Sequence, residues 1–535
     1  MVLTLSLLLV YSRKIFPSHV EMGGRHALAL CVALTIGGSL PRFAASLHAL
    51  SQQSTSVVLL LSLSIVTSLL TIATLFLEYK LTSHYSSDTS RLLLFPTIWV
   101  VLWAGIAALS PLGTLSTWSP VEGTGAYDWL VPWFSGPYAL NWVAAAWATI
   151  LSQTLTSLYM GPTSGGENGH GSQASHSVRS VMTANDKTAL LAAVLVLLTV
   201  PSYIGDSLPV PLGDVSKGTP LVIGCALPTV DEYKVPEFKF EHFLAESKRL
   251  DNTANFILWP EGAVRFSSEK ERNDSLAEVQ KNILHAFVGV SFEETVEDAE
   301  NSNNRHGVRR AGIAIVSNRS PTPHLLYYKQ HLVPIAESFS LTHSLESPTT
   351  FSAEITYPKR IPVPGHKREI PVTASICLDF SAPSQFTNLE VRPGLILAPA
   401  RTWDTTVGYT MWKQASQRAR EIGSTVLWCD GGEGGVSGVA GHGYNEVVQV
   451  GSGSWLRTIA LEFPFDENSR TLYGHYGNAV LLVFCVLAAG IPIGAGYMVG
   501  SNMKQHVGSF ARYVIERFRR WGVGSAPPVA NLIDV

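Results

Sequence analysis

The stretch VTASICLDF, residues 372–380, is an apolar run rich in β-branched residues that leads directly to Cys377. Such a run favours a buried β-strand, and a strand that ends at a thiol is a common way to present a nucleophile. A single cysteine in an apolar run is also often a small buried core residue. On this stretch alone both interpretations of Cys377 stay open.

Two further apolar runs end in charged residues. FILWPEGA, residues 256–263, favours a buried strand that its proline ends, and Glu261 follows at the carboxyl end. LLYYKQHLVPIAE, residues 325–337, places Lys329 after another such run. A carboxylate can take the proton of a thiol, the thiolate can attack a carbonyl, and an ammonium can stabilise the oxyanion. The sequence therefore predicts Glu261 as base, Lys329 as oxyanion stabiliser and Cys377 as nucleophile.

A second carboxylate, Glu337, closes the segment that carries Lys329. We expect Glu337 to support the lysine, although a purely structural hydrogen-bond acceptor would give the same pattern. Likewise, a lysine at the end of a strand can be an ordinary surface residue. The three stretches taken together favour the catalytic interpretation of Lys329.

The segments WPEGA, YYKQHLVPIAE and ICLDF, in this order, resemble the motifs of the nitrilase (carbon–nitrogen hydrolase) superfamily over roughly residues 220–475. Within that superfamily they look most like the apolipoprotein N-acyltransferases. The resemblance implies an α/β domain folded as a nitrilase-like αββα sandwich, with Glu261, Lys329 and Cys377 as its triad. It also implies a phospholipid as acyl donor and an amine, such as the amino-terminal cysteine of a lipoprotein, as acceptor.

Two departures from that family lie near the nucleophile. Leu378-Asp379 stands where the bacterial N-acyltransferases typically have Tyr-Glu. Residues 399–404 lack their Asn-Asp-Ala-Trp-Phe pattern, although Trp403 can fill a similar role. Both departures leave the triad intact and bear on the acyl acceptor. We expect Asp379 and Trp403 to support the site.

The composition indicates a membrane protein. Of the 535 residues, 46% are hydrophobic and only 15% are charged, whereas about 25% is typical of soluble domains. The net charge of −3 gives no bulk attraction to nucleic acid, and the spacing of the five cysteines predicts no metal site. No cofactor is expected. Six apolar segments approach the roughly 20 residues that cross a bilayer, namely 27–45, 57–77, 92–109, 138–159, 188–204 and 479–499.

These segments divide the chain. We predict a multi-pass helical membrane domain over 1–205, a nitrilase-like domain over 218–475, a last span at 479–499 and a basic tail over 500–535. Each segment taken singly could instead be a buried core helix, but five in succession make that interpretation poor. Residues 1–10 are apolar but short, and whether they span a membrane stays open.

The distribution of basic residues predicts the topology. The tail after residue 499 is basic, whereas the loop 111–137 contains neither Lys nor Arg, and basic flanks favour the cytosol. We therefore expect the region 206–477 to be extracytoplasmic (periplasmic, lumenal or extracellular) and the C-terminus to be cytosolic. Whether Cys225 and Cys429 pair in such a compartment stays open.

Two loops are candidates for bringing lipid to the catalytic site. The loop 111–137 carries Trp129 and Trp133, which we expect to face lipid, although an interfacial aromatic belt would have the same composition. Residues 338–355 are expected to form a long loop of the kind that often acts as a lid.

Three function classes follow. The first is a membrane-bound acyltransferase that moves an acyl group from phospholipid through a Cys377 thioester to an amine. The second is a membrane-tethered amidase or nitrilase that uses the same triad with water. The third is a membrane scaffold without activity, against which the complete set of Glu261, Lys329 and Cys377 argues. The predicted spans favour the transferase, because a hydrolase with a dissolved substrate does not need them.

Overall fold

The computed structural model of the protein describes most of residues 1–487. The segments outside the description are 17–19, 83–87, 117–124, 134–135, 161–186, 205–207, 236, 297–307, 360, 362, 478, 481, 485 and 488–535. The predicted basic tail and most of the predicted span at 479–499 therefore lie outside the described residues.

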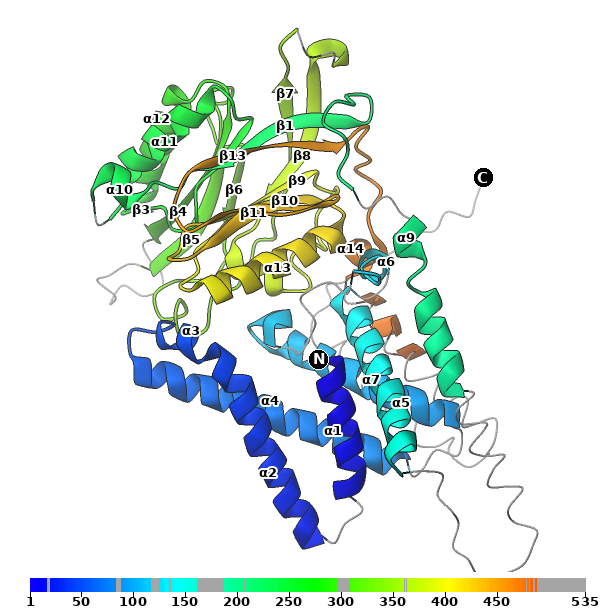
Figure 1. Ribbon diagram of the computed structural model, residues 1–535. Helices are drawn as coiled ribbons and strands as arrows, with labels where there is room; N and C mark the ends of the chain where they lie inside the picture. The colour runs from blue at the N-terminus through cyan, green and yellow to red at the C-terminus, as the bar shows by residue number, and fades with distance from the viewer. Residues whose placement is uncertain are drawn as a thin grey trace, which may run out of the picture.

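Two sheets form the centre of the domain predicted over 218–475 (Figure 1). In the first sheet the strand order is β13-β1-β2-β4-β5-β6, and β3 pairs with β4. Its strands are β1 (Gly218–Cys225), β2 (Phe256–Leu258), β3 (Val264–Phe266), β4 (Phe287–Val296), β5 (Val308–Val316), β6 (Leu325–Tyr328) and β13 (Trp455–Glu462).

The second sheet runs in the order β12-β11-β10-β9-β8-β7. The predicted long loop at 338–355 is wrong at its end, because β7 begins at Phe351 and pairs with β8. The strands of this sheet are β7 (Phe351–Thr356), β8 (Lys367–Ala374), β9 (Leu395–Ala400), β10 (Thr425–Asp430), β11 (Val436–Gly441) and β12 (Tyr444–Val450).

The side chains of the strands alternate between two apolar cores. In β2, Phe256 and Leu258 belong to the core shared by both sheets, whereas the neighbouring Ile257 packs in a second core with α11 and α12. This alternation is the two-residue period of a strand buried on both faces. Helices α10 (Val230–Tyr233), α11 (Phe240–Asp251) and α12 (Glu269–Asn282) accompany the first sheet.

Helix α13 (Thr405–Ile422) packs against β10 and β11 of the second sheet. The side chain of Asp404 accepts a hydrogen bond from the amide of Thr406 and caps the helix start. Gly423 ends the helix at φ +71°, a left-handed conformation that favours glycine. The predicted order of layers, helix–sheet–sheet–helix, is therefore present, with α13 between the second sheet and the long helices (Figure 1).

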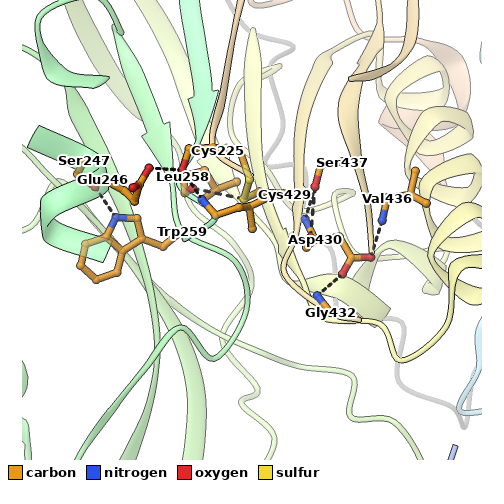
Figure 2. Close-up of a disulfide and its surroundings, with 12 residues drawn as sticks. Cys225, Glu246, Ser247, Leu258, Trp259, Cys429, Asp430, Gly432, Val436 and Ser437 are labelled. Carbon is orange, nitrogen blue, oxygen red and sulfur yellow. Dashed lines mark hydrogen bonds between the residues drawn. A yellow bond between two sulfur atoms is a disulfide. The ribbon is translucent and has the colours of Figure 1, made fainter. Parts of the chain in front are cut away.

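A disulfide between Cys225 and Cys429 joins the two sheets, a pairing that the sequence left open (Figure 2). Cys225 ends β1 of the first sheet, and Cys429 lies near the end of β10 of the second. Their Cα atoms are 5.7 Å apart although the residues are separated by 204 positions. Closing so long a loop removes much conformational entropy from the unfolded chain in the entropy account of disulfide stability.

Among the described residues, four helices are long and apolar enough to cross a membrane, by length and composition. They cover four of the five amino-terminal spans that the sequence predicts. They are Gly23–Leu47, Gln53–Thr82, Arg91–Leu109 and Lys187–Ile204.

The fifth predicted amino-terminal span, 138–159, forms a helix but is not one of these four. This helix, α7 (Pro137–Met160), packs against α1 (Val2–Ile15) and α5 (Asp88–Leu109) and buries Asn141 completely. Polar side chains such as Asn141 interrupt the apolar run of this helix. Helices α1 and α5 cover part of its surface. Helix α1, at 14 residues, is shorter than the roughly 20 residues of a span.

Candidate active site

Glu261 lies where the ends of the two sheets approach each other. It follows β2, and its amide donates a hydrogen bond of 3.3 Å to the carbonyl of Ala400, the last residue of β9 in the other sheet. Gly262 comes next at φ +62°, which lets the chain turn sharply there. The side chain of Glu261 is buried near the carboxyl end of β2, as the sequence predicts.

Lys329 reaches the same point from β6. Its amide is fixed by a 3.0 Å hydrogen bond to the carbonyl of Ala311, and its Nζ lies 2.6 Å from Oε1 of Glu261. Nζ also lies 2.8 Å from each carboxylate oxygen of Glu337. Glu337 is held in turn by the amide of Val333, at 2.8 Å. The structure thus places the predicted supporting carboxylate in direct contact with the lysine.

Cys377 begins the short 3-10 helix Cys377–Ser381 that follows β8. It has φ +43°, a conformation uncommon for a residue with a side chain. Strained backbone of this kind is often found where a fold fixes a reactive group. Burial is nearly complete at all three positions: Glu261 is 7% exposed, Lys329 1% and Cys377 5%.

The thiol and the carboxylate are adjacent. Oε2 of Glu261 is buried and, among the described residues, has no hydrogen-bond partner. The Cys377 side chain interacts with this carboxyl group and lowers its pKa. One oxygen of Glu261 therefore serves Lys329, and the other is available to Cys377.

Burial and charge together set the protonation states. Burial raises the pKa of Glu261 to about 7, against the opposing effect of the Lys329 ammonium. Burial and the charge of Glu261 raise the pKa of the Cys377 thiol well above its usual value. Burial disfavours the charge on Lys329, but Glu261, Cys377 and Glu337 outweigh it and raise the pKa of the amine. The site holds a protonated thiol beside a carboxylate able to exchange protons near neutral pH.

Asp379 connects the nucleophile to the lysine. This buried carboxylate accepts hydrogen bonds from the amides of Ile376, Gln330 and His331, at 3.2, 3.1 and 2.7 Å. It also accepts one from the hydroxyl of Tyr327, at 2.8 Å. Gln330 and His331 directly follow Lys329, so Asp379 fixes the lysine segment against the Cys377 turn.

Asp430 is a supporting residue that the sequence did not identify. Its carboxylate accepts hydrogen bonds from the amide and hydroxyl of Thr402, at 2.9 and 2.7 Å, and from the amides of Gly432 and Val436 (Figure 2). It therefore holds the loop that follows β9. The Asp-Gly-Gly segment after an apolar run was the available signal, because such segments favour turns.

The predicted supporting tryptophan, Trp403, links the sandwich to the helical bundle. It lies in the loop held by Asp430, and its Nε1 donates a 3.1 Å hydrogen bond to the carbonyl of Ala45 in α3 (Phe43–Leu47). A second link joins the hydroxyl of Thr114, in the loop 111–137, to the carbonyl of Ser381, at 3.1 Å. The Cys377 turn and its neighbouring loop thus both touch the predicted membrane domain over 1–205.

The predicted lipid-facing residues, Trp129 and Trp133, lie together but not at the triad. Nε1 of Trp129 donates a 2.7 Å hydrogen bond to the carbonyl of Leu198, and Trp133 is exposed. Both line a cavity whose lining includes neither Glu261, Lys329 nor Cys377. In the described part of the chain, no group of three or more His, Cys, Asp or Glu side chains is arranged to hold a metal ion.

Comparison with known proteins gives structural neighbours only. No protein-family model matches the chain, and no curated protein matches it. Solved structures similar to it include an amidase from Nesterenkonia sp. AN1 (15% identity, TM-score 0.31, 46% of this chain and 93% of that one). A second is Saccharomyces cerevisiae Nit3 of the nitrilase superfamily, with 13% identity and a TM-score of 0.33 over 46% of this chain and 90% of that one. A third is an N-terminal amidase with an Asn-Glu-Ala peptide, with 10% identity and a TM-score of 0.32 over 47% of this chain and 100% of that one.

Proposed function

We propose that this protein is a membrane-bound acyltransferase in which Cys377 carries the acyl group as a thioester. The observation that supports it most directly is the buried contact set at the triad. Lys329 lies 2.6 Å from one oxygen of Glu261. The other oxygen has no hydrogen-bond partner within the described part of the chain, and Cys377 stands on strained backbone. These are the base, charge and thiol that acyl transfer requires.

In the first half-reaction the Cys377 proton passes to Glu261 and the sulfur attacks the carbonyl carbon of a phospholipid ester. Lys329 stabilises the negative oxygen of the tetrahedral intermediate. The carbon–oxygen bond then breaks, and the leaving lysophospholipid oxygen takes the proton from Glu261. The enzyme is left with a neutral thioester and an ionised carboxylate.

In the second half-reaction an amine attacks the thioester and gives a proton to Glu261. The carbon–sulfur bond breaks, the amide leaves, and the proton returns from Glu261 to the Cys377 sulfur. The acceptor is an amine of the lipoprotein type. An amidase or nitrilase would run the same cycle with water, and the four candidate spans favour the lipid donor because they bring the domain to a membrane.

The test is acyl loading of the full-length protein in membranes that contain a phospholipid with an isotopically labelled acyl chain. Mass spectrometry should find the labelled chain on Cys377, and an added amine should remove it as an N-acyl product. The C377A variant should carry no label, because removing the nucleophile of a triad costs about 10⁶-fold. Loss of the acyl group to water at the same rate with or without amine would favour a hydrolase, and an unloaded Cys377 would exclude phospholipid as the acyl donor.

We also propose that the region 206–477 lies outside the cytosol. The disulfide between Cys225 and Cys429 supports this, because such bonds persist in oxidising compartments. A single-cysteine variant at the exposed Asn273 should react with an impermeant thiol reagent applied from the outside of intact cells or right-side-out vesicles. Protection of that cysteine from the outside would reject the topology.

A further inference from the structure

The Cys377 turn, which is the 3-10 helix Cys377–Ser381 with the following Ala382, has the thiol at its first residue and backbone carbonyls at its other end. The last carbonyls of a helix find no partner inside it and must be satisfied from outside. Here the carbonyls of Phe380, Ser381 and Ala382 all accept hydrogen bonds from side chains of other segments. Because the turn is so short, a shift of this carbonyl end would also move Cys377.

Arg418 in α13 makes most of these bonds with a single guanidinium group. Its Nε donates to the carbonyl of Phe380, at 3.2 Å, and its Nη2 to that of Ala382, at 2.9 Å. Nη1 donates to the carbonyl of Pro383, at 3.5 Å, and to Oε2 of Glu421, at 2.6 Å. Arg418 is 2% exposed. The rigid fork of a guanidinium can meet several fixed acceptors at once, which the single ammonium of a lysine does less well.

The loop 111–137 of the predicted membrane domain contacts the same end of the turn. The hydroxyl of Thr114 donates a 3.1 Å hydrogen bond to the carbonyl of Ser381. Gly113, at φ +55°, approaches so closely that a Cβ at this position would overlap the same carbonyl oxygen, so only glycine allows the contact. Near the other end of the loop, a Cβ on Gly136 would lie 3.1 Å from the glutamate that pairs with Arg418. Both ends of this loop thus meet the groups around the Cys377 turn.

Helix α13 presents different residues to the turn and to the cavity that Trp129 lines. Gln414, one turn of helix before the arginine, also donates to the carbonyl of Phe380, at 3.3 Å, and does not line the cavity. Lys413 and Arg420 line the cavity instead. We call this space the cavity outside α13. The helix therefore contacts the Cys377 turn through residues that take no part in the cavity.

We propose that Arg418 and Thr114 are positioning residues for Cys377, which hold the carbonyl end of its turn from α13 and from the membrane domain and so keep the thiol beside Glu261. The carboxylate of Glu421 alone would compensate the charge of Arg418. The bonds to three backbone carbonyls are what connect this buried pair to the thiol. For its rate measurements the inference rests on the proposed acyl transfer.

The first test compares acyl loading of full-length variants over a range of labelled phospholipid concentrations. R418Q E421Q removes both charges of the buried pair, which avoids leaving one of them uncompensated. Its maximal loading rate should fall about 10²-fold, the order expected when a reacting group is displaced by about 1 Å. The phospholipid concentration that gives half the maximal rate should not change. R418K, which keeps the charge without the fork, should load at an intermediate rate.

T114V tests the contact from the membrane domain. It removes one hydroxyl at nearly constant volume and should lower the maximal loading rate about fivefold, the usual contribution of one neutral hydrogen bond. The half-saturating phospholipid concentration should again stay the same. Because Thr114 belongs to a different segment from Arg418, this variant tests the inference even where the arginine variants fail to fold.

Hydrogen exchange of the peptide that spans residues 376–382 measures the hold on the turn without acyl transfer. The amides of Asp379 and Ala382 donate to carbonyls within this peptide, those of Ile376 and Asp379. Their exchange should be about fivefold faster in T114V and faster still in R418Q E421Q, because local opening becomes easier when outside contacts are lost.

Two matched controls separate these contacts from general effects. R457Q E446Q removes another arginine–glutamate pair, which joins β12 to β13 and makes no hydrogen bond to the turn in the described part of the chain. T410V removes an exposed hydroxyl that bonds only within α13. Both should load and exchange like the wild type. Thermal unfolding of each variant identifies any that is misfolded.

Wild-type loading by folded R418Q E421Q and T114V would overturn the inference and leave acyl transfer intact. Faster exchange with an unchanged maximal rate would also overturn it, because the two residues would then be structural only. A rise in the half-saturating concentration at constant maximal rate would assign them to lipid binding instead. A wild type that carries no label would contradict the phospholipid donor, and the exchange of the turn peptide would then decide this inference by itself.

Discussion

The triad and the cavity outside α13 handle charge in opposite ways. At the triad one ammonium, Lys329, lies within 2.8 Å of two carboxylates; Lys329 and Glu261 are buried, and Glu337 is partly exposed. In the cavity outside α13, aromatic rings and backbone carbonyls hold two of the cations: Arg392 lies over Phe465 and donates to the carbonyl of Gly423, and Lys413 lies over Tyr409. The first arrangement places opposite charges in direct contact. The second spreads positive charge over neutral partners.

Removing the base should affect only the first of these regions, and strongly. In E261Q, thioester formation should fall about 10²–10⁴-fold, because the amide cannot accept the thiol proton. Acyl loading on Cys377, followed in a rapid-quench time course, measures the effect. Native-rate loading by a folded E261Q would show that Glu261 is not the base.

The pH dependence of the acyl-loading rate also tests Glu261 as the base. The pKa of Glu261 is raised to about 7, so the carboxylate form that can accept a proton predominates above that pH. The loading rate of the wild-type protein should therefore fall about tenfold per unit below pH 7 and level off above it. The residual rate of E261Q should show no such inflection. A wild-type profile that is flat from pH 5 to 8 would contradict the assignment.

Removing the disulfide should lower the stability of the domain that contains the two sheets. The C225S C429S double variant should lose about 2–5 kcal/mol of stability, because the bond constrains a very long loop of the unfolded chain. The unfolding midpoint of the full-length protein, with and without reductant, measures this. C31S is the matched control, since Cys31 is a free cysteine in the helical bundle. An equal midpoint for wild type and double variant would show that the bond contributes nothing.

Weakening the hydrogen bonds that Asp379 accepts tests how far acyl loading depends on the positions of Lys329 and Cys377. In D379N the amide group would face several donors that now meet a carboxylate, including the amides of Gln330 and His331. A displacement of about 1 Å at a reacting group can cost about 10²-fold, so we expect a loss of that order in acyl loading. Unchanged loading, with normal reactivity of Cys377, would reduce Asp379 to a purely structural residue.

The smallest effect should come from the two tryptophans. W129S W133S should lower acyl loading from phospholipid by less than about tenfold, because each ring contributes apolar contact area rather than reacting atoms. The reaction of Cys377 with a small water-soluble thiol reagent should not change. If both reactions fall together, the loop is structural. If neither changes, the donor lipid reaches Cys377 by another path, and these residues belong only to the cavity.

Sequence alone placed the three candidate catalytic residues after strands, because each stands at the end of an apolar run and that pattern is local. Glu261, Lys329 and Cys377 follow β2, β6 and β8 as expected. By contrast, β13 was not predicted, because a strand at the edge of a sheet is defined by the strand it pairs with.

Tertiary structure decided what depends on residues far apart in the chain. The disulfide joins positions separated by 204 residues, and no spacing rule connects them. Helix α7 covers the predicted span 138–159, and only the fold shows that it packs against α1 and α5. The cavity cations come from α13 and from segments before and after it. Nothing in the sequence connects these residues, and only folding brings them to the lining of one cavity.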